Sequence, residues 1–426
     1  MDDNHPCWYR RRGYLHFDLP IGTKKAISLT SNPSFVKKHS FYPLINYEVS
    51  SKKINKDKLS GKLLAKNKMR PIAYSSHVDS HIYAFYAEKL SELYEGTLKG
   101  NGLDKSVLAF RNLGKSNIDF AYEAFLKIKE MGECSAVALD FSKFFDTLDH
   151  NLLKKSWCKL LGQEKLPPDH FNVFKSITKF STVDKLELYK LFSISKNKPR
   201  NQHKRICSSE DFRTKVRAEG LIKPNLCGYG IPQGSPISAL LSNIYMLDFD
   251  LEMKKYADIH GGYYFRYCDD MLFIMPKRLK NKVAGFAQKH ISKLKVRINP
   301  DKTEIRQFNK VGNILKADNT LQYLGFIFDG ENIYLRSSSL ARYSEKMRRG
   351  VSLAKQTMRK YNDIRAMKGA DEKALYKKKL YSRYTHLGGR NFITYGLRAA
   401  NKMESNTIKK QLKPLWRRFH EELDKD

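Results

Sequence analysis

The sequence contains no run of 18 or more apolar residues, and its first residues lack the basic-then-apolar order of a secretory signal. A membrane-spanning helix requires such a run, and a signal peptide requires such an order. Internal repeats and low-complexity tracts are absent as well. We therefore expect a globular, cytoplasmic protein that does not enter a membrane.

Cysteine is scarce: the six cysteines lie far apart, and none belongs to a CxxC pair. Disulfide frameworks are typical of short secreted chains, so we interpret these residues as reduced thiols. His203, Cys207 and Cys227 would supply three zinc ligands, but no fourth ligand is evident. Scattered core or surface residues are therefore the preferred interpretation.

Acidic residues are the minority charge, with 44 Asp+Glu against 79 Lys+Arg, which gives a formal net charge of +35. A positive field of this size favours a polyanionic partner, with an acidic membrane surface as the competing interpretation. Hydrophobic residues still make up 41% of the 426 residues and aromatics 12%. This content exceeds that of a disordered polycation and predicts a folded chain of two to three subdomains.

Two segments are predicted to carry carboxylates at the ends of strands. Residues 135–139 form a short apolar run that ends at Asp140. Residues 263–265 and 271–274 are apolar runs on either side of Cys268-Asp269-Asp270, which predicts a tight hairpin. Three carboxylates from two strands can hold two Mg²⁺ ions about 3.5–4 Å apart for phosphoryl displacement. The alternative is an Asp-Asp turn selected only for its geometry, and spacing alone does not separate the two.

Two amphipathic helices are predicted from apolar residues at three- and four-residue spacing. The first begins at Asp79, and the second is long and begins at Leu340. The apolar face of the second consists of Leu340, Tyr343, Met347, Val351, Ala354, Met358 and Tyr361. Its other faces carry cations, among them Arg342, Lys346 and Arg349. Because the basic pattern continues to Arg418 with few acids, it favours a nucleic-acid groove over a merely solvated face.

Arginines also gather near the N-terminus, where Arg10, Arg11 and Arg12 lie between aromatic residues. This composition suits base stacking and phosphate contact, and an arm packed on the main domain is an equal alternative. A second basic run, over residues 196–205, has five positive residues and no acid. We interpret it as a solvated loop that is also able to touch nucleic acid.

Six short motifs follow one another in the order found in polymerases. They are 70–72 (RPI), 138–146 (ALDFSKFFD), 230–238 (GIPQGSPIS), 267–270 (YCDD), 299–303 (NPDKT) and 323–326 (YLGF). The chain therefore resembles, over about residues 60 to 330, a bacterial reverse transcriptase related to group II introns. The resemblance implies an α+β right-hand polymerase with fingers, a palm with an antiparallel sheet, and a helical thumb.

The same resemblance implies the boundaries of the subdomains and the metal ligands. We expect an N-terminal arm and fingers over 1–134, a palm over 135–330 and a helical basic thumb over 331–426, with 161–227 shared between palm and fingers. Asp140, Asp269 and Asp270 would hold two Mg²⁺ ions, with Mn²⁺ as an alternative, and the Phe141 carbonyl would complete one coordination sphere. Catalysis would then consist mostly of positioning and charge neutralisation.

Other residues receive roles in nucleotide binding from the resemblance. Arg70 would hold the incoming triphosphate, since a forked guanidinium suits phosphate. Gln233 and Gly234 would let the backbone approach the nascent base pair. Lys302 would protonate or neutralise the leaving pyrophosphate, and a surface lysine is the alternative.

Phe145 discriminates between DNA and RNA synthesis. It stands five residues after Asp140, where reverse transcriptases carry an aromatic wall under the sugar. RNA-dependent RNA polymerases usually carry an acid at this position and GDD in place of YCDD. Both features favour deoxynucleotides (dNTPs), and packing in the core is the alternative for Phe145.

Several missing signatures narrow the kind of reverse transcriptase. We find no maturase, endonuclease or RNase H pattern, and neither the valine-threonine-glycine nor the NAxxH signature of retron enzymes. The segments 12–18 (RGYLHFD) and 208–213 (SSEDFR) resemble the corresponding segments of stand-alone defence-associated reverse transcriptases. The length of the chain and the YCDD motif are most similar to those of the type 2 members of this group.

That group implies a structured noncoding RNA, encoded nearby, that is copied into repeated cDNA during antiphage defence. The alternatives are a retron-like or intron-derived enzyme with a different RNA, and a non-catalytic ribonucleoprotein scaffold. The intact Asp140, Asp269 and Asp270 argue against the scaffold. The oligomeric state and the primer stay open.

Overall fold

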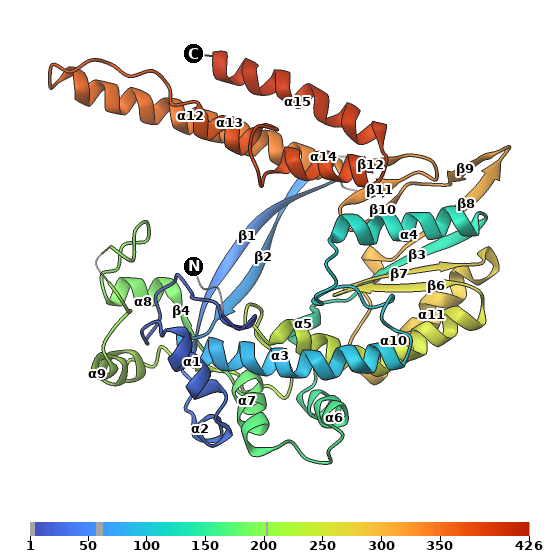
Figure 1. Ribbon diagram of the computed structural model, residues 1–426, viewed down its shortest axis with the longest axis horizontal. Coiled ribbons are helices and arrows are strands. Elements are labelled where there is room, and N and C mark those ends of the chain that lie inside the picture. Colours follow the sequence, from blue (N-terminus) through green and yellow to red (C-terminus); the bar gives the residue numbers. More distant parts are fainter. Residues whose placement is uncertain (1–4, 57–62, 202, 426) are drawn as a thin grey trace.

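The computed structural model describes residues 5–56, 63–201 and 203–425 of the chain. Figure 1 shows a sheet with helices on both sides, a long two-stranded hairpin beside it, and a group of helices formed by the C-terminal part of the chain. Among the described residues, no helix combines the length and the apolar composition needed to cross a bilayer.

The central five-stranded sheet is antiparallel, with the strand order β6-β7-β3-β8-β9. Its strands are β3 (Cys134–Asp140), β6 (Tyr263–Tyr267), β7 (Asp270–Met275), β8 (Glu304–Val311) and β9 (Ile314–Ala317). Val137 and Leu139 of β3 enter the core on one face, whereas Cys134 and Ala136 enter the core on the other. A strand buried on both faces gives an uninterrupted apolar run, so the predicted strand and hairpin are confirmed.

A helical core lies on the first face of this sheet, where α10 contacts β6 and α11 contacts β3. Its helices are α3 (His77–Gly100), α6 (His150–Leu161), α7 (Pro168–Thr178), α10 (Ser238–Ile259) and α11 (Lys280–Lys293). The predicted helix at Asp79 is the beginning of α3, which Ser76 caps by accepting the Asp79 backbone N–H at 3.2 Å. α10 is buried around most of its circumference, so it forms the centre of this core.

The second face is covered by α4 (Asn117–Met131), a small antiparallel sheet and the C-terminal helices. The small sheet consists of β10 (Leu321–Tyr323), β11 (Phe326–Phe328) and β12 (Ile333–Leu335). The helices are α12 (Ser337–Ala366), α13 (Lys378–Tyr384), α14 (Phe392–Lys402) and α15 (Asn406–Asp424). Figure 1 shows α12 and α15 extending away from the five-stranded sheet.

The apolar face predicted for α12 is correct in its first half and wrong at its end. Tyr343, Met347 and Val351 are buried, but Tyr361 is 54% exposed. Near Tyr361, the returning chain is held through Asn362, whose side chain donates to the Lys373 carbonyl at 3.0 Å. A polar contact therefore replaces the apolar packing that the spacing predicted.

A third sheet lies at the N-terminal side, in the order β2-β1-β4-β5. Its strands are β1 (Leu44–Lys56), β2 (Leu63–Tyr74), β4 (Ser181–Asp184) and β5 (Lys223–Pro224). Short helices accompany it: α1 (Thr23–Thr30), α2 (Pro33–Lys38), α8 (Lys185–Leu191), α9 (Ser209–Asp211) and the π-helix η1 (Phe212–Arg217). β1 pairs with β2 along its whole length, which makes the long hairpin of Figure 1.

The N-terminal arm, residues 5–20, packs on α3. The Tyr9 ring stacks on the His81 ring at 4.9 Å, and the Trp8 ring meets the Phe85 ring edge-on at 5.6 Å. Its aromatics are therefore used in packing, which is the second of the two alternatives for this segment. Arg10 and Arg11 remain exposed.

Candidate active site

The ends of β3 and β7 bring two of the three predicted carboxylates face to face. Asp140, the last residue of β3, pairs in register with Asp270, the first residue of β7. Asp269 lies in the two-residue turn between β6 and β7, where Cys268 adopts a positive φ of 60°. The backbone N–H of Phe141 donates to the Asp269 carbonyl at 3.3 Å, which ties the turn to β3. Two segments far apart in sequence thus place three acids at one sheet end.

The crowding of these acids has an electrostatic cost. Although part of the Asp270 side chain is accessible to solvent, dehydration by surrounding atoms raises the pKa of its carboxyl to about 7. The negative charges of Asp269 and then Asp140 contribute to the same shift, whereas the charge of Lys302 opposes it. Near neutral pH, the Asp270 carboxyl is therefore only partly ionised unless a further cation is present.

Lys302 supplies the positive charge that the structure places at this site. It ends the short 3₁₀-helix η3 (Pro300–Lys302), whose preceding residue Asn299 accepts the Asp301 backbone N–H at 3.1 Å. The Lys302 ammonium donates to the Asp140 carboxylate, and the backbone N–H of Asn299 donates to the Asp140 carbonyl at 2.7 Å. The structure thus brings Lys302 to the carboxylates, although its side chain remains partly exposed.

The three carboxylates are the candidate metal ligands at this sheet end. In the part of the chain that the structure describes, no three His, Cys, Asp or Glu side chains are grouped as ligands of one ion. This holds for His203, Cys207 and Cys227 as well as for the carboxylates. The three acids nevertheless fit a hard divalent cation, since they offer carboxylate oxygens, and since burial followed by the charges of Asp269 and Asp140 raises the pKa of Asp270. Lys302 is the group that a bound ion would displace from Asp140.

The segment after Asp140 places the predicted sugar-contacting residue. Phe141 and Phe144 are buried and their rings lie 5.1 Å apart, so at Phe141 only the backbone is available to a ligand. Phe145, in the single turn α5 (Phe144–Thr147), is only partly buried. Its carbonyl accepts the Ile231 backbone N–H at 2.9 Å, which joins this turn to the loop containing Gln233.

The loop that contains Gln233 and Gly234 packs on β2. The Gln233 carbonyl accepts the Ala73 backbone N–H at 2.7 Å. Gly234 has a φ of +112°, and a Cβ there would lie 2.7 Å from the Ala73 carbonyl oxygen. The glycine is thus required by contact with the protein's own backbone, a reason that the sequence did not reveal. Arg70 lies three residues before Ala73 on β2 and is exposed.

The sequence reasoning missed an ion pair under the hairpin turn. Arg266 and Asp250 are both 0% exposed, and the guanidinium donates to the two carboxylate oxygens at 2.7 and 2.6 Å. Arg266 also donates to the Asn243 side chain at 3.0 Å and to the Cys268 carbonyl at 3.1 Å. One arginine thereby connects α10 with the turn that carries Asp269. The available signal was a charged residue inside the apolar strand 263–267.

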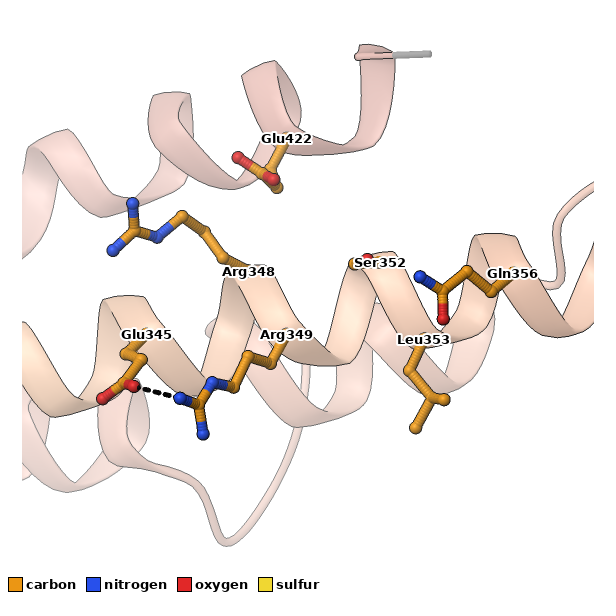
Figure 2. Close-up of a pocket in the computed structure, with 7 residues that line it drawn as sticks. All are labelled: Glu345, Arg348, Arg349, Ser352, Leu353, Gln356 and Glu422. Carbon is orange, nitrogen blue, oxygen red and sulfur yellow. Dashed lines mark ion pairs between the residues drawn. The ribbon is translucent and has the colours of Figure 1, made fainter.

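The basic residues predicted for nucleic-acid contact are divided among separate surfaces. Arg342 and Lys346 of α12 line a cavity of about 750 Å³ together with Arg383 and Arg390, and no acid lines it. Arg349 faces a different pocket, of about 450 Å³, between α12 and α15, where it pairs with Glu345 at 2.7 Å (Figure 2). The structure therefore brings Arg342 and Lys346 together and leaves Arg349 apart from them.

A family model described as reverse transcriptase (RNA-dependent DNA polymerase) matches residues 54–328. No curated protein matches the sequence. Among solved structures, apo telomerase from Candida tropicalis truncated from its C-terminal domain is similar at 13% identity and a TM-score of 0.41, covering 68% of this chain and 57% of its own. Telomerase from Candida albicans in complex with a fragment of telomeric RNA has 11% identity and a TM-score of 0.38, covering 94% and 65%.

The chain thus spans between half and two thirds of the length of these telomerase chains. The family match identifies the domain over residues 54–328 as that of an RNA-directed DNA polymerase, a nucleotidyltransferase. Reverse transcriptases use divalent metal ions, in agreement with the acidic donor set. The predicted α+β right-hand polymerase fold is confirmed by the family and by the antiparallel sheets and helices. The chain therefore belongs to the reverse transcriptase family.

Proposed function

We propose that this chain copies RNA into DNA at the ends of β3 and β7, with Asp140, Asp269 and Asp270 as the catalytic carboxylates. The observation that carries this proposal is the pairing of Asp140 with Asp270, which crowds negative charge where a cation is needed. Two Mg²⁺ ions, or Mn²⁺ in their place, would neutralise the triphosphate and align it with the primer hydroxyl. The Phe141 backbone carbonyl would be a further ligand, because its ring is fixed in the core.

The chain's own residues would position the nucleotide around these acids. Arg70 would bind the triphosphate from β2, and the Gln233–Gly234 loop would support the nascent base pair from the contact with Ala73. Phe145 would block a ribose 2′-OH. Lys302 already lies at Asp140, so it is close enough to neutralise or protonate the leaving pyrophosphate.

We also propose the division into an arm with fingers (1–134), a palm (135–330, with 161–227 shared with the fingers) and a thumb (331–426). The thumb in this division consists of α12 to α15, and Figure 1 shows α12 and α15 extending away from the five-stranded sheet, which supports this proposal. Arg342, Lys346 and Arg349 of the thumb, with Arg10, Arg11 and Arg12 of the arm, would bind RNA. The cavity lined by four cations and no acid supports this role for Arg342 and Lys346.

The RNA in this proposal is a structured noncoding RNA encoded beside the gene, copied in the cytoplasm into repeated cDNA during antiphage defence. Its support is the resemblance of segments 12–18 and 208–213 to bacterial defence-associated reverse transcriptases, together with a net charge of +35. Folded RNA is bound largely through phosphate and 2′-OH contacts, which suits dispersed basic residues. A retron-like or intron-derived enzyme with a different RNA is the second candidate.

The test is to purify the protein from its own locus, wash it at moderate salt and sequence the bound RNA and the attached cDNA. One dominant RNA encoded beside the gene, with cDNA complementary to it, is the expected result. An Asp140→Asn variant should retain the RNA and lack the cDNA, which separates the polymerase from a non-catalytic scaffold. A random sample of cellular RNA would refute the dedicated partner.

A further inference from the structure

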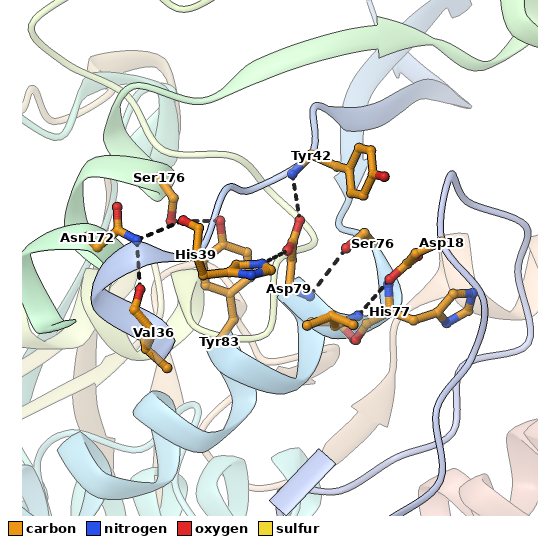
Figure 3. Close-up of polar contacts among 12 residues, drawn as sticks. Asp18, Val36, His39, Tyr42, Ser76, His77, Asp79, Tyr83, Asn172 and Ser176 are labelled. Carbon is orange, nitrogen blue, oxygen red and sulfur yellow. Dashed lines mark hydrogen bonds and ion pairs between the residues drawn. The ribbon is translucent and has the colours of Figure 1, made fainter. Parts of the chain in front are cut away.

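Buried polar atoms without partners gather where the N-terminal arm meets the start of α3. His16, Ser75 and His77 are each at most 2% exposed. Nε2 of His16, Oγ of Ser75 and both ring nitrogens of His77 have no hydrogen-bond partner. Figure 3 shows the His77 ring projecting away from the first turn of α3, on the side of Asp18. Unpaired buried polar groups are costly, so a group of them calls for an absent partner.

The nearby carboxylates are already occupied. Asp18 accepts the backbone N–H groups of His77 and Val78, both at 2.9 Å, at the N-terminus of α3. Asp79 accepts from the His39 ring at 2.7 Å and from the Tyr42 backbone N–H at 3.0 Å (Figure 3). Neither acid bonds to the His77 ring nitrogens. The His77 ring nitrogens are therefore not satisfied by either neighbouring carboxylate.

Two arginines converge on the same place from different segments. Arg12 lies on the arm, and its Nε is buried without a partner. Arg200 belongs to the basic run 196–205, and its Nη1 lies 3.4 Å from the position that a Cβ on Gly13 would take. Burial is the main cause that lowers the pKa of His77; the charge of Asp18 and the backbone of Tyr14 oppose this shift, and the charges of Arg12 and Arg200 add to it. Two cations thus lie near ring nitrogens whose hydrogen bonding is incomplete among the described residues, an arrangement that suits an anion.

We propose that Arg12, His16, His77 and Arg200 form a phosphate-binding site separate from the Asp140 carboxylates. The guanidinium groups would neutralise the phosphate, and the His77 ring would donate one hydrogen bond to it. The site adjoins the β2 end that holds Gln233, because Ala73 lies four residues before His77. Phosphate binding does not depend on the polymerase chemistry, whereas the assignment of this phosphate to bound RNA rests on the proposed function.

The experiment is isothermal titration of the full-length protein with three probes: inorganic phosphate, deoxyadenosine monophosphate, and a short RNA with or without a 5′-phosphate. Arg200→Ala removes an exposed arginine, and Lys198→Ala is a matched control that removes an exposed cation from the same run. We expect Arg200→Ala to weaken phosphate binding by at least about tenfold, and the control by less than about twofold. Arg12→Gln provides a second variant, and circular dichroism verifies that each variant is folded.

The probes identify the source of the phosphate. Tighter binding of the 5′-phosphorylated RNA than of the unphosphorylated RNA indicates a terminal phosphate. Equal binding of both RNAs indicates an internal phosphate. Preference for the mononucleotide indicates that the site binds a free nucleotide. Absence of phosphate binding to the wild-type protein, or an affinity of both Arg200→Ala and Arg12→Gln equal to that of the wild type, overturns the site. Primer extension by the same preparations keeps the two proposals apart, because an active polymerase without phosphate binding contradicts only this site.

Discussion

Asp250 on α10 and the group of Asp140, Asp269 and Asp270 differ in how their negative charge is balanced. Asp250 is fully buried and has Arg266 as a bidentate partner. At the turn, Asp269 and Asp270 approach Asp140, and Lys302 is the cation bonded to Asp140. Arg266 connects the two groups, because it also donates to the Cys268 carbonyl.

This difference separates an acid that is neutralised within the fold from the acids that we propose to be catalytic. The chain has 79 Lys+Arg for 44 Asp+Glu, so a shortage of cations does not explain the crowded carboxylates. Asp250 is neutralised within the fold, where its partner also supports the turn. At the other acids, dehydration is the larger cause that raises the pKa of Asp270 to about 7, and the negative charges of Asp269 and Asp140 add to this rise. A bound divalent cation would relieve the repulsion between these charges, in agreement with the metal-dependent reaction that we propose.

The largest expected effect is the loss of DNA synthesis when the crowded acids are removed. Asp269→Ala combined with Asp270→Ala should lower primer extension on an RNA template by at least about 10³-fold, because the divalent ions lose their ligands. Folding and RNA binding should be largely intact, since the change removes repulsion and no paired contact. Primer extension, circular dichroism and filter binding measure the three properties. Extension at the wild-type rate in Mg²⁺ would refute the assignment.

The paired acid should show the reverse behaviour. Asp250→Ala leaves the buried Arg266 charge uncompensated, so the free energy of unfolding should fall by about 3–5 kcal/mol. Asp248→Ala is the matched control on the same helix, since it breaks the exposed pair with Lys159 and should cost less than about 1 kcal/mol. Denaturant titration measures both. Similar losses in the two variants would show that burial does not distinguish these pairs.

A third change tests an aromatic side chain next to the acids. Phe145→Ala should raise the efficiency of ribonucleotides relative to deoxyribonucleotides by roughly 10–100-fold, because it opens space for the 2′-OH. Phe144→Ala is the control, since it removes the buried neighbouring ring and should leave this ratio unchanged. A loss of folded enzyme lowers both efficiencies equally, so it does not change their ratio. Steady-state kinetics with paired nucleotides measures it. An unchanged ratio in Phe145→Ala would assign that ring to packing.

The smallest expected effect is a pH dependence of stability without divalent ions. The folded-state pKa of Asp270 is raised from 3.8 to about 7, so the folded protein binds a proton that the unfolded chain releases above about pH 4. The wild type should therefore lose stability relative to Asp270→Asn as the pH rises from about 4 to about 7. Parallel stability curves for the two proteins, measured by urea unfolding, would show that folding does not raise the pKa of Asp270.

The sequence predicted the elements whose signal is local. The apolar run before Asp140 and the runs around Asp269 are continuous because both faces of the sheet are covered, and so β3, β6 and β7 were correct. The pair of Asp250 with Arg266 was missed because its partners belong to a helix and a strand that meet only in the folded chain. The steric reason for Gly234 was missed likewise, since it depends on Ala73. At Tyr361, the helical spacing was right, but the side chain is 54% exposed.

The central claim is that Asp140, Asp269 and Asp270 together bind divalent ions. Mn²⁺ binding to the purified protein, followed by the electron paramagnetic resonance signal of the free ion, tests it most directly. We expect the wild-type protein to remove Mn²⁺ from solution, Mg²⁺ to compete for the same sites, and the variant with Asp269→Ala and Asp270→Ala to lose this binding while it stays folded. Equal Mn²⁺ binding by the wild type and the folded variant would contradict the claim.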